Sequence, residues 1–153
     1  MLNSARFSKV ALRGVCAALT LTCSAFIIGC WQWSHDEVSR VASPDGRTDA
    51  VLFEENGGAT TSFDYVVDVV PHGEKNMKQV GEIYGAVRNT QAYGVDLRWI
   101  DSNTVEADYL TSKTAPVVDS VILDGRKISL VFKEGVTDAA APSGGMLYNL
   151  QKP

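Results

Sequence analysis

Residues 117–132 read VVDSVILDGRKISLVF, in which two mainly apolar runs flank an Asp-Gly pair. An Asp-Gly pair between such runs is typical of a two-residue type I′ turn, which joins two antiparallel strands. Counting outward from this turn pairs Val121 with Ile128 and Val117 with Phe132, all on one apolar face. The segment therefore predicts a β-hairpin with one buried side.

Segments on the N-terminal side of this hairpin also have the composition of strands. The alternation is clear in residues 63–70, where every second side chain is apolar and therefore shares one face of a sheet. Ser43-Pro44-Asp45-Gly46 has residues that suit successive positions of a β-turn, and it predicts a strand directly after it. The predicted strands before the hairpin are 49–54, 63–70, 80–87, 95–99 and 105–109.

About seven strands and no amphipathic helix after residue 30 predict an all-β domain. We expect one small antiparallel sheet that closes into a sandwich or a small barrel over residues 43–133. Residues 30–42 are predicted to be a polar tether. Residues 134–153, rich in Gly, Ala, Pro and Ser, are predicted to be a loose tail, in which residues 145–150 could add a short strand.

The N-terminal segment has a different character, because Arg6, Lys9 and Arg13 are the only charged side chains before Asp36. An uncharged, mainly apolar run of 14 residues follows, Val15–Ile28. This length suits the hydrophobic region of a signal peptide and falls short of the roughly 20 residues that span a bilayer. The pattern predicts a cleaved signal helix.

The run ends in Ile27-Ile28-Gly29-Cys30, which resembles the cleavage site of bacterial prolipoproteins. The resemblance implies that the Cys30 thiol receives a diacylglyceryl group and that the signal peptide, residues 1–29, is removed. Two or more acyl chains then anchor the protein stably in a membrane. No cofactor is expected.

The alternative is an uncleaved helix, since Gly14–Trp33 is an uncharged run of 20 residues that ends in two interfacial tryptophans. Both interpretations leave the basic N-terminus in the cytoplasm and the folded part outside it. The expected location is therefore the bacterial cell envelope, with the β domain on the periplasmic or extracellular face.

Charge and cysteine usage exclude several classes of function. All 18 acidic residues but only 11 of the 14 basic ones follow Cys30, so residues 30–153 carry a net charge of −7. This charge argues against nucleic-acid binding, which needs a basic surface. Cys16, Cys23 and Cys30 are the only cysteines, so no disulfide is expected within the mature domain.

The candidate binding site is a loop whose glycines and hydroxyls could present backbone N–H groups to an anion. Its alternative is a solvent-exposed connection between two strands, since the loop lacks the lysine and the spacing of a P-loop. The loop consists of Asn56, Gly57, Gly58, Ala59, Thr60 and Thr61.

The span from Ser43 to Tyr109 resembles a group of short, uncharacterised bacterial envelope proteins. The shared elements are Ser-Pro-Asp-Gly at 43–46, Gly-Ala-Thr-Thr at 58–61 and Val-Asp-Leu-Arg-Trp at 95–99. The resemblance implies an envelope protein and no particular activity. This chain departs from it at Asn56-Gly57, where those proteins would place a cysteine.

Catalytic motifs are missing from the mature sequence: it has no cysteine nucleophile, no H-E-x-x-H, no G-x-S-x-G and no S-x-x-K. We therefore predict a noncatalytic, membrane-anchored lipoprotein that binds another envelope component, with no metal site. One alternative is an inhibitor or immunity-type lipoprotein. The other is a small hydrolase or a cation-binding domain, if acidic strand residues gather on one sheet face: Asp64, Asp68, Asp96, Glu106 and Asp108.

Overall fold

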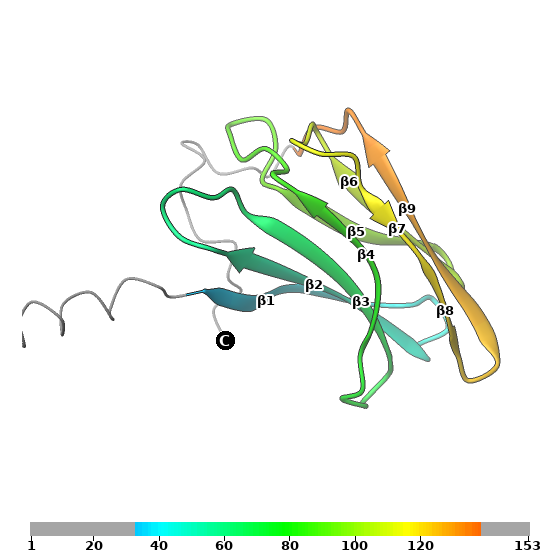
Figure 1. The fold of residues 1–153 in the computed structure, drawn as a ribbon. Helices are drawn as coiled ribbons and strands as arrows, with labels where there is room; N and C mark the ends of the chain where they lie inside the picture. The colour runs from blue at the N-terminus through cyan, green and yellow to red at the C-terminus, as the bar shows by residue number, and fades with distance from the viewer. Residues whose placement is uncertain (1–32, 139–153) are drawn as a thin grey trace, which may run out of the picture. The chain divides into compact units, whose positions relative to one another are not determined.

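The computed structural model describes residues 33–138, which form two β-sheets packed face to face (Figure 1). The strand orders are β1-β2-β3-β4-β7 and β5-β6-β9-β8. The strands are β1 (Ser34–Ala42), β2 (Thr48–Asn56), β3 (Asp64–Pro71), β4 (Lys78–Tyr84), β5 (Val95–Asp101), β6 (Thr104–Tyr109), β7 (Val117–Val118), β8 (Ser120–Leu123) and β9 (Arg126–Glu134). The predicted all-β class is confirmed. Of the two expected architectures, a sandwich or a small barrel, the structure has the sandwich, with two sheets and nine strands where one sheet and about seven strands were predicted. Within this range no helix is long and apolar enough to cross a membrane.

One large apolar core fills the space between the sheets. Tyr65, Val67 and Val69 of β3 are fully buried in it, and Phe63 packs against them, as the alternation of residues 63–70 predicted. Ile128 of β9 belongs to the same cluster from the other sheet. Burial of such a side chain contributes about 1.5–3 kcal/mol, so this core is the main source of stability.

The β8–β9 hairpin forms as its sequence predicted. Asp124 and Gly125 both have positive φ angles, 49° and 75°, as a type I′ turn requires. Val121 lies opposite Ile128 in the antiparallel register. The Asp-Gly pair therefore sets the register of this half of the second sheet.

The predicted pairing of Val117 with Phe132 is wrong. Val117 lies in β7, which pairs with β4 in the first sheet, opposite Glu82. The bare backbone of Gly81 permits this approach, since a Cβ there would lie 2.7 Å from the carbonyl oxygen of Val117. The chain then crosses to the second sheet at Asp119.

This crossing also explains why the second sheet is mixed and not purely antiparallel. β6 and β9 run parallel, with Val105 opposite Leu130. After β6 the chain visits the first sheet as β7 and re-enters the second at its edge as β8. The β8–β9 hairpin then places β9 beside β6 in the same direction.

The predicted tether is another difference, because Ser34–Ala42 forms β1 and pairs along β2. The register shifts between Glu37 and Ser39, which marks a bulge at Val38. Val38 is buried and Val41 also packs against the core. Their spacing of three residues does not fit a regular strand, and the bulge accommodates it.

The sandwich has two ends. The N-terminal end, at the upper left in Figure 1, carries the start of β1 and the connections 57–63, 85–94 and 110–116. The hairpin end, at the lower right, carries the connections 43–47, 72–77, 102–103 and 124–125. The candidate loop at residues 56–61 therefore belongs to the same end as the first described residue.

Some predictions fall on residues 1–32 and 139–153, which lie outside the described part of the chain. These are the signal peptide at residues 1–29, the lipid attachment at Cys30 and the short strand at 145–150. The start of the predicted tail is described: β9 continues through Glu134, and Gly135 N donates a hydrogen bond to Leu110 O at 3.1 Å.

Candidate functional site

A buried ion pair underlies the N-terminal end of the sandwich. Glu54, near the end of β2, is 9% exposed and accepts hydrogen bonds from Tyr65 OH at 3.0 Å and Arg88 Nη1 at 3.2 Å. Arg88 Nη2 donates to Tyr93 OH at 2.5 Å. The guanidinium also lies over two rings, 4.2 Å from the centroid of Phe63 and 4.5 Å from that of Tyr93.

The electrostatics of this group favour a structural role. Burial raises the pKa of Glu54, while the Arg88 charge and the Tyr65 hydrogen bond act in the opposite direction. Burial and the Glu54 charge raise the pKa of Tyr65 as well, so its hydroxyl stays protonated as a donor. Each oxygen of the Glu54 carboxylate has a partner, and the pair joins the 85–94 connection to β2.

Gly94 lies directly against this ion-pair network, with a φ of 82°. A Cβ at Gly94 would lie 2.5 Å from Tyr65 Cζ. We expect Gly94→Ala to lower the free energy of unfolding by about 1–2 kcal/mol from backbone strain, plus about 1–3 kcal/mol from overpacking. Denaturant titration measures this loss.

The matched control is Gly73→Ala, at an exposed site with a φ of 81° and no atom within 4 Å of the added Cβ. It carries the same backbone strain without the overlap, so its loss should be limited to about 1–2 kcal/mol. Equal losses of unfolding free energy in both variants would show that the Tyr65 ring moves away from the added Cβ without destabilising the fold.

A first open hollow of about 330 Å³ lies above the ion pair, and we call it the Lys113 hollow. Its lining combines hydroxyls, apolar side chains and two cations: Thr61, Ser62, Phe63, Gly85, Ala86, Val87, Arg88 and Lys113. Arg88 is already paired with Glu54, so the ammonium of Lys113 is the exposed charge here. Lys113 N donates to Tyr84 O at 3.1 Å, which fixes the backbone at this position.

A second open hollow, of about 210 Å³, has the opposite character, and we call it the Trp33 hollow. Its lining includes two aromatic and two acidic side chains: Trp33, Glu55, Gly57, Thr61, Ser62, Asp64 and Tyr84. Glu55 pairs with His35 Nδ1 at 2.8 Å. Burial and the Glu82 carboxylate raise the pKa of Asp64, and its Oδ1 is buried without a hydrogen-bond partner among the described residues.

The predicted binding loop contributes to both hollows through Thr61. Asn56 Oδ1 accepts a hydrogen bond from Gly58 N at 2.9 Å, and Gly58 O accepts one from Thr61 N at 3.2 Å. These two N–H groups therefore bond within the loop and do not face an anion. The exposed part of the loop is Ala59, Thr60 and Thr61.

The acidic strand residues do not gather on one sheet face, which corrects the arrangement that the alternative hypothesis required. Asp64 and Asp68 lie on β3 of the first sheet, whereas Asp96, Glu106 and Asp108 lie on β5 and β6 of the second. No group of three His, Cys, Asp or Glu residues suited to a metal ion occurs within residues 33–138.

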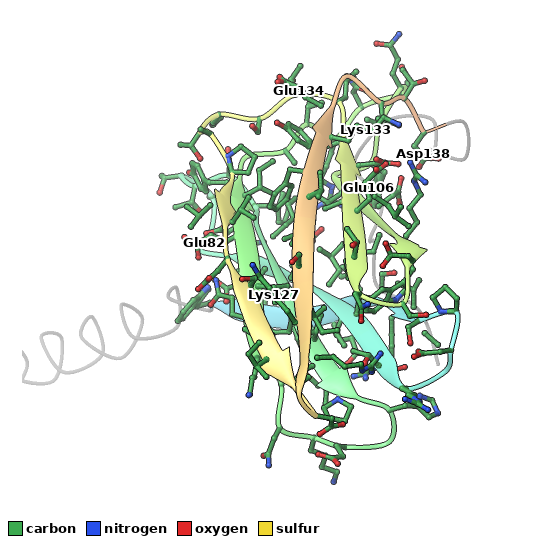
Figure 2. The ribbon with its side chains drawn as sticks, turned by 90° about the vertical axis from the view of Figure 1, so that its right-hand side faces the viewer. Glu82, Glu106, Lys127, Lys133, Glu134 and Asp138 are labelled. Carbon is green, nitrogen blue, oxygen red and sulfur yellow. The ribbon has the colours of Figure 1, made fainter. Side chains whose placement is uncertain are left out.

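Basic side chains offset the acids of the second sheet. Arg98 forms ion pairs with Glu106 and with Asp108, the latter at 3.1 Å. Lys133 Nζ lies 3.6 Å from Glu106 Oε1, and Figure 2 shows these two residues on neighbouring strands. The charged side chains on this face are therefore arranged as cross-strand pairs.

Sequence reasoning missed four side chains that shape this end of the molecule. From the sequence, Trp33 is interpreted only as an interfacial residue of a membrane anchor. No role is assigned from the sequence to Arg88, Tyr84 or Lys113. They lie in separate segments that the fold brings together through the 85–94 and 110–116 connections. An exposed tryptophan beside a predicted anchor was the one available signal.

No protein-family model, curated protein or solved structure gives a significant match to this chain. By its fold, the chain is a small all-β sandwich in which one of the two sheets is mixed. Two open hollows of opposite charge lie at its N-terminal end, on either side of the Thr61–Ser62 wall.

Proposed function

We propose that this chain is a membrane-anchored, noncatalytic envelope lipoprotein that binds another envelope component at the N-terminal end of its sandwich. The anchor is the acylated Cys30 that ends the lipobox-like segment at residues 27–30. The binding site is the exposed loop at residues 56–61 with the two hollows beside it.

The observation that carries this proposal is the position of the hollows relative to the start of the domain. β1 begins at Ser34, and Trp33 itself lines one hollow. Only Trp31 and Gln32 separate Cys30 from Trp33. An acylated Cys30 therefore leaves no room for a long linker, and it keeps the binding site close to the membrane.

The noncatalytic part of the proposal is supported by the engagement of two glutamates at this end, Glu54 and Glu55. Glu54 is bonded to Arg88 and Tyr65, and Glu55 is bonded to His35. General acid–base catalysis needs a group within hydrogen-bond reach of a substrate proton. A pair of carboxylates free to flank a glycosidic bond is not found among these residues.

Photo-crosslinking in intact cells tests the proposed binding site. A photoreactive amino acid replaces Thr60 at the tip of the loop, and a matched variant carries it at Lys75, an exposed position at the hairpin end. We expect the Thr60 variant to form one recurrent adduct, identified by mass spectrometry as a protein, a glycan or a lipid of the envelope.

The Lys75 variant should not form the same adduct. Identical products at both positions, or none at Thr60, would contradict binding at the N-terminal end. An adduct with a foreign enzyme whose activity falls on binding would identify the inhibitor or immunity alternative.

A further inference from the structure

The N-terminal end of the sandwich lies within reach of lipid headgroups, provided that Cys30 is acylated as proposed above. The three residues from Cys30 to Trp33 span at most about 11 Å. The polar layer on each side of a bilayer is about 5–8 Å thick. Trp33 and the hollow that it lines can therefore reach the level of the headgroups.

Trp33 has the exposure and chemistry of an interfacial residue. Its side chain is 67% exposed, a high value for an indole in a domain with a well-packed core. Tryptophan favours the membrane–water interface, where its ring contacts acyl chains and its N–H meets water or headgroups. The surface around the exposed indole of Trp33, which lines the Trp33 hollow, is thus suited to contact with lipid.

The Trp33 hollow has the chemistry of a site for an ammonium group. The indole of Trp33 attracts a cation through its ring electrons, and Tyr84, whose ring centroid already lies 6.0 Å from the Lys113 ammonium, lines the same hollow. Asp64 adds a carboxylate whose Oδ1 accepts no hydrogen bond within the described part of the chain. Glu55 adds a second carboxylate, which His35 already contacts.

The adjoining Lys113 hollow has the chemistry of a site for a phosphate group. Its exposed cation is Lys113. Thr61 and Ser62 line it as well, and Ser62 can donate its hydroxyl, whereas the Thr61 hydroxyl already donates to Gly58 O at 3.1 Å. The same two residues line the Trp33 hollow, so the two hollows share a wall. The Lys113 ammonium lies 6.0 Å from the centroid of the Tyr84 ring, which borders the acidic hollow.

We propose that the two hollows together bind the zwitterionic headgroup of a phospholipid, with its ammonium in the Trp33 hollow and its phosphate at Lys113. In phosphatidylethanolamine these two groups are separated by two carbons, which suits neighbouring hollows with a shared wall. The bound headgroup holds the N-terminal end against the bilayer. The hairpin end then projects away by about 30 Å, the length of a nine-residue strand.

The headgroup selectivity follows from the charges. An anionic headgroup such as phosphatidylglycerol has no ammonium, and its phosphate would meet the carboxylates of Glu55 and Asp64. A zwitterionic headgroup satisfies both hollows at once. The chain should therefore prefer phosphatidylethanolamine over phosphatidylglycerol. A site that offered only an exposed lysine would show the opposite preference, for the anionic lipid.

The test uses the full chain in a nonionic detergent, titrated with dihexanoyl-phosphatidylethanolamine and with dihexanoyl-phosphatidylglycerol. Binding is followed by tryptophan fluorescence and by isothermal titration calorimetry. We expect about tenfold tighter binding of the ethanolamine lipid, since one charge-assisted hydrogen bond is worth about that factor. Free glycerophosphoethanolamine, as a third ligand, should bind more weakly than the lipid, because acyl contacts with Trp33 are then lost.

Two variants and two matched controls locate the site. Asp64→Asn and Lys113→Gln should each raise the Kd for the ethanolamine lipid about tenfold. Glu74→Gln and Lys75→Gln, exposed at the hairpin end, should leave it unchanged. Equal affinity for both lipids, or equal effects of all four variants, would overturn the proposal. If a variant fails to fold, the preference of the wild-type chain for the ethanolamine lipid over the glycerol lipid still tests the proposal.

Failure of this inference is distinguishable from failure of the proposed anchor. Binding in detergent does not require an acylated Cys30, whereas the mass of the N-terminal peptide reports acylation directly. If the chain is lipidated but shows no headgroup selectivity, the headgroup site is ruled out and the proposed anchor is retained. If glycerophosphoethanolamine binds as tightly as the lipid, the site recognises a free phosphodiester, and the proposal that its ligand is a membrane lipid is wrong.

Discussion

Arg88→Met is expected to lower the free energy of unfolding at pH 7 by about 3–5 kcal/mol, the usual cost of leaving one partner of a buried ion pair uncompensated. The side chains of Arg88 and Glu54 are only 10% and 11% exposed. Methionine fills much of the same space but supplies no charge and no hydrogen-bond donor. Chemical denaturation followed by tryptophan fluorescence measures the loss.

The loss should depend on pH in a defined direction. Burial raises the pKa of Glu54 in the folded state, so its contribution to stability falls as the pH rises through that pKa. Removal of the Arg88 charge raises the pKa further. The difference between wild type and Arg88→Met should therefore be large at pH 7 and small at pH 4, where Glu54 is increasingly protonated.

Arg98→Met is the matched control, because Arg98 also pairs with carboxylates but its side chain is 52% exposed. Water screens this pair, so a much smaller loss is expected. The double variant Glu54→Gln/Arg88→Met should recover part of the stability lost in Arg88→Met, since no charge is then left unpaired. Equal losses in Arg88→Met and Arg98→Met would contradict the role of the buried pair.

Cys30→Ser is expected to abolish incorporation of labelled fatty acid and to leave an unprocessed precursor. The reason is chemical: under the proposed lipidation the diacylglyceryl group is carried by the Cys30 thiol, which serine lacks. Cells that express the chain are fed an alkyne-tagged palmitate, and the purified protein is assayed for the tag and for electrophoretic size.

Cys23→Ser is the matched control, since Cys23 lies inside the predicted signal peptide and is lost on cleavage. It should be labelled and processed like the wild type. If wild type, Cys23→Ser and Cys30→Ser are all unlabelled and equally retained in the membrane, the uncleaved helix over residues 14–33 is the better interpretation.

The strands that could be predicted are those whose register is set locally. The Asp124-Gly125 turn needs only two residues, and the alternation of residues 63–70 needs only one buried face. β1 could not be recognised, because the bulge at Val38 breaks its period of two. The move of Val117 into the first sheet depends on the bare backbone of Gly81, which is remote in sequence.

The candidate site was predictable only in part. The loop at residues 56–61 carried a local signal in its glycines and hydroxyls, and it does border both hollows. The charges that distinguish these hollows come from distant segments. Lys113 follows β6, whereas Asp64 begins β3, and only the packing of the two sheets brings them to one end.

The central claim is that Cys30 is the acylated first residue of the mature protein. Mass spectrometry of the N-terminal peptide from the membrane-extracted chain tests it most directly. We expect a peptide that begins at Cys30 and carries the mass of a diacylglyceryl group, with or without an amide-linked acyl chain. A peptide that continues unmodified through Gly29 and Cys30 would contradict the claim, and with it the placement of the N-terminal end at the membrane.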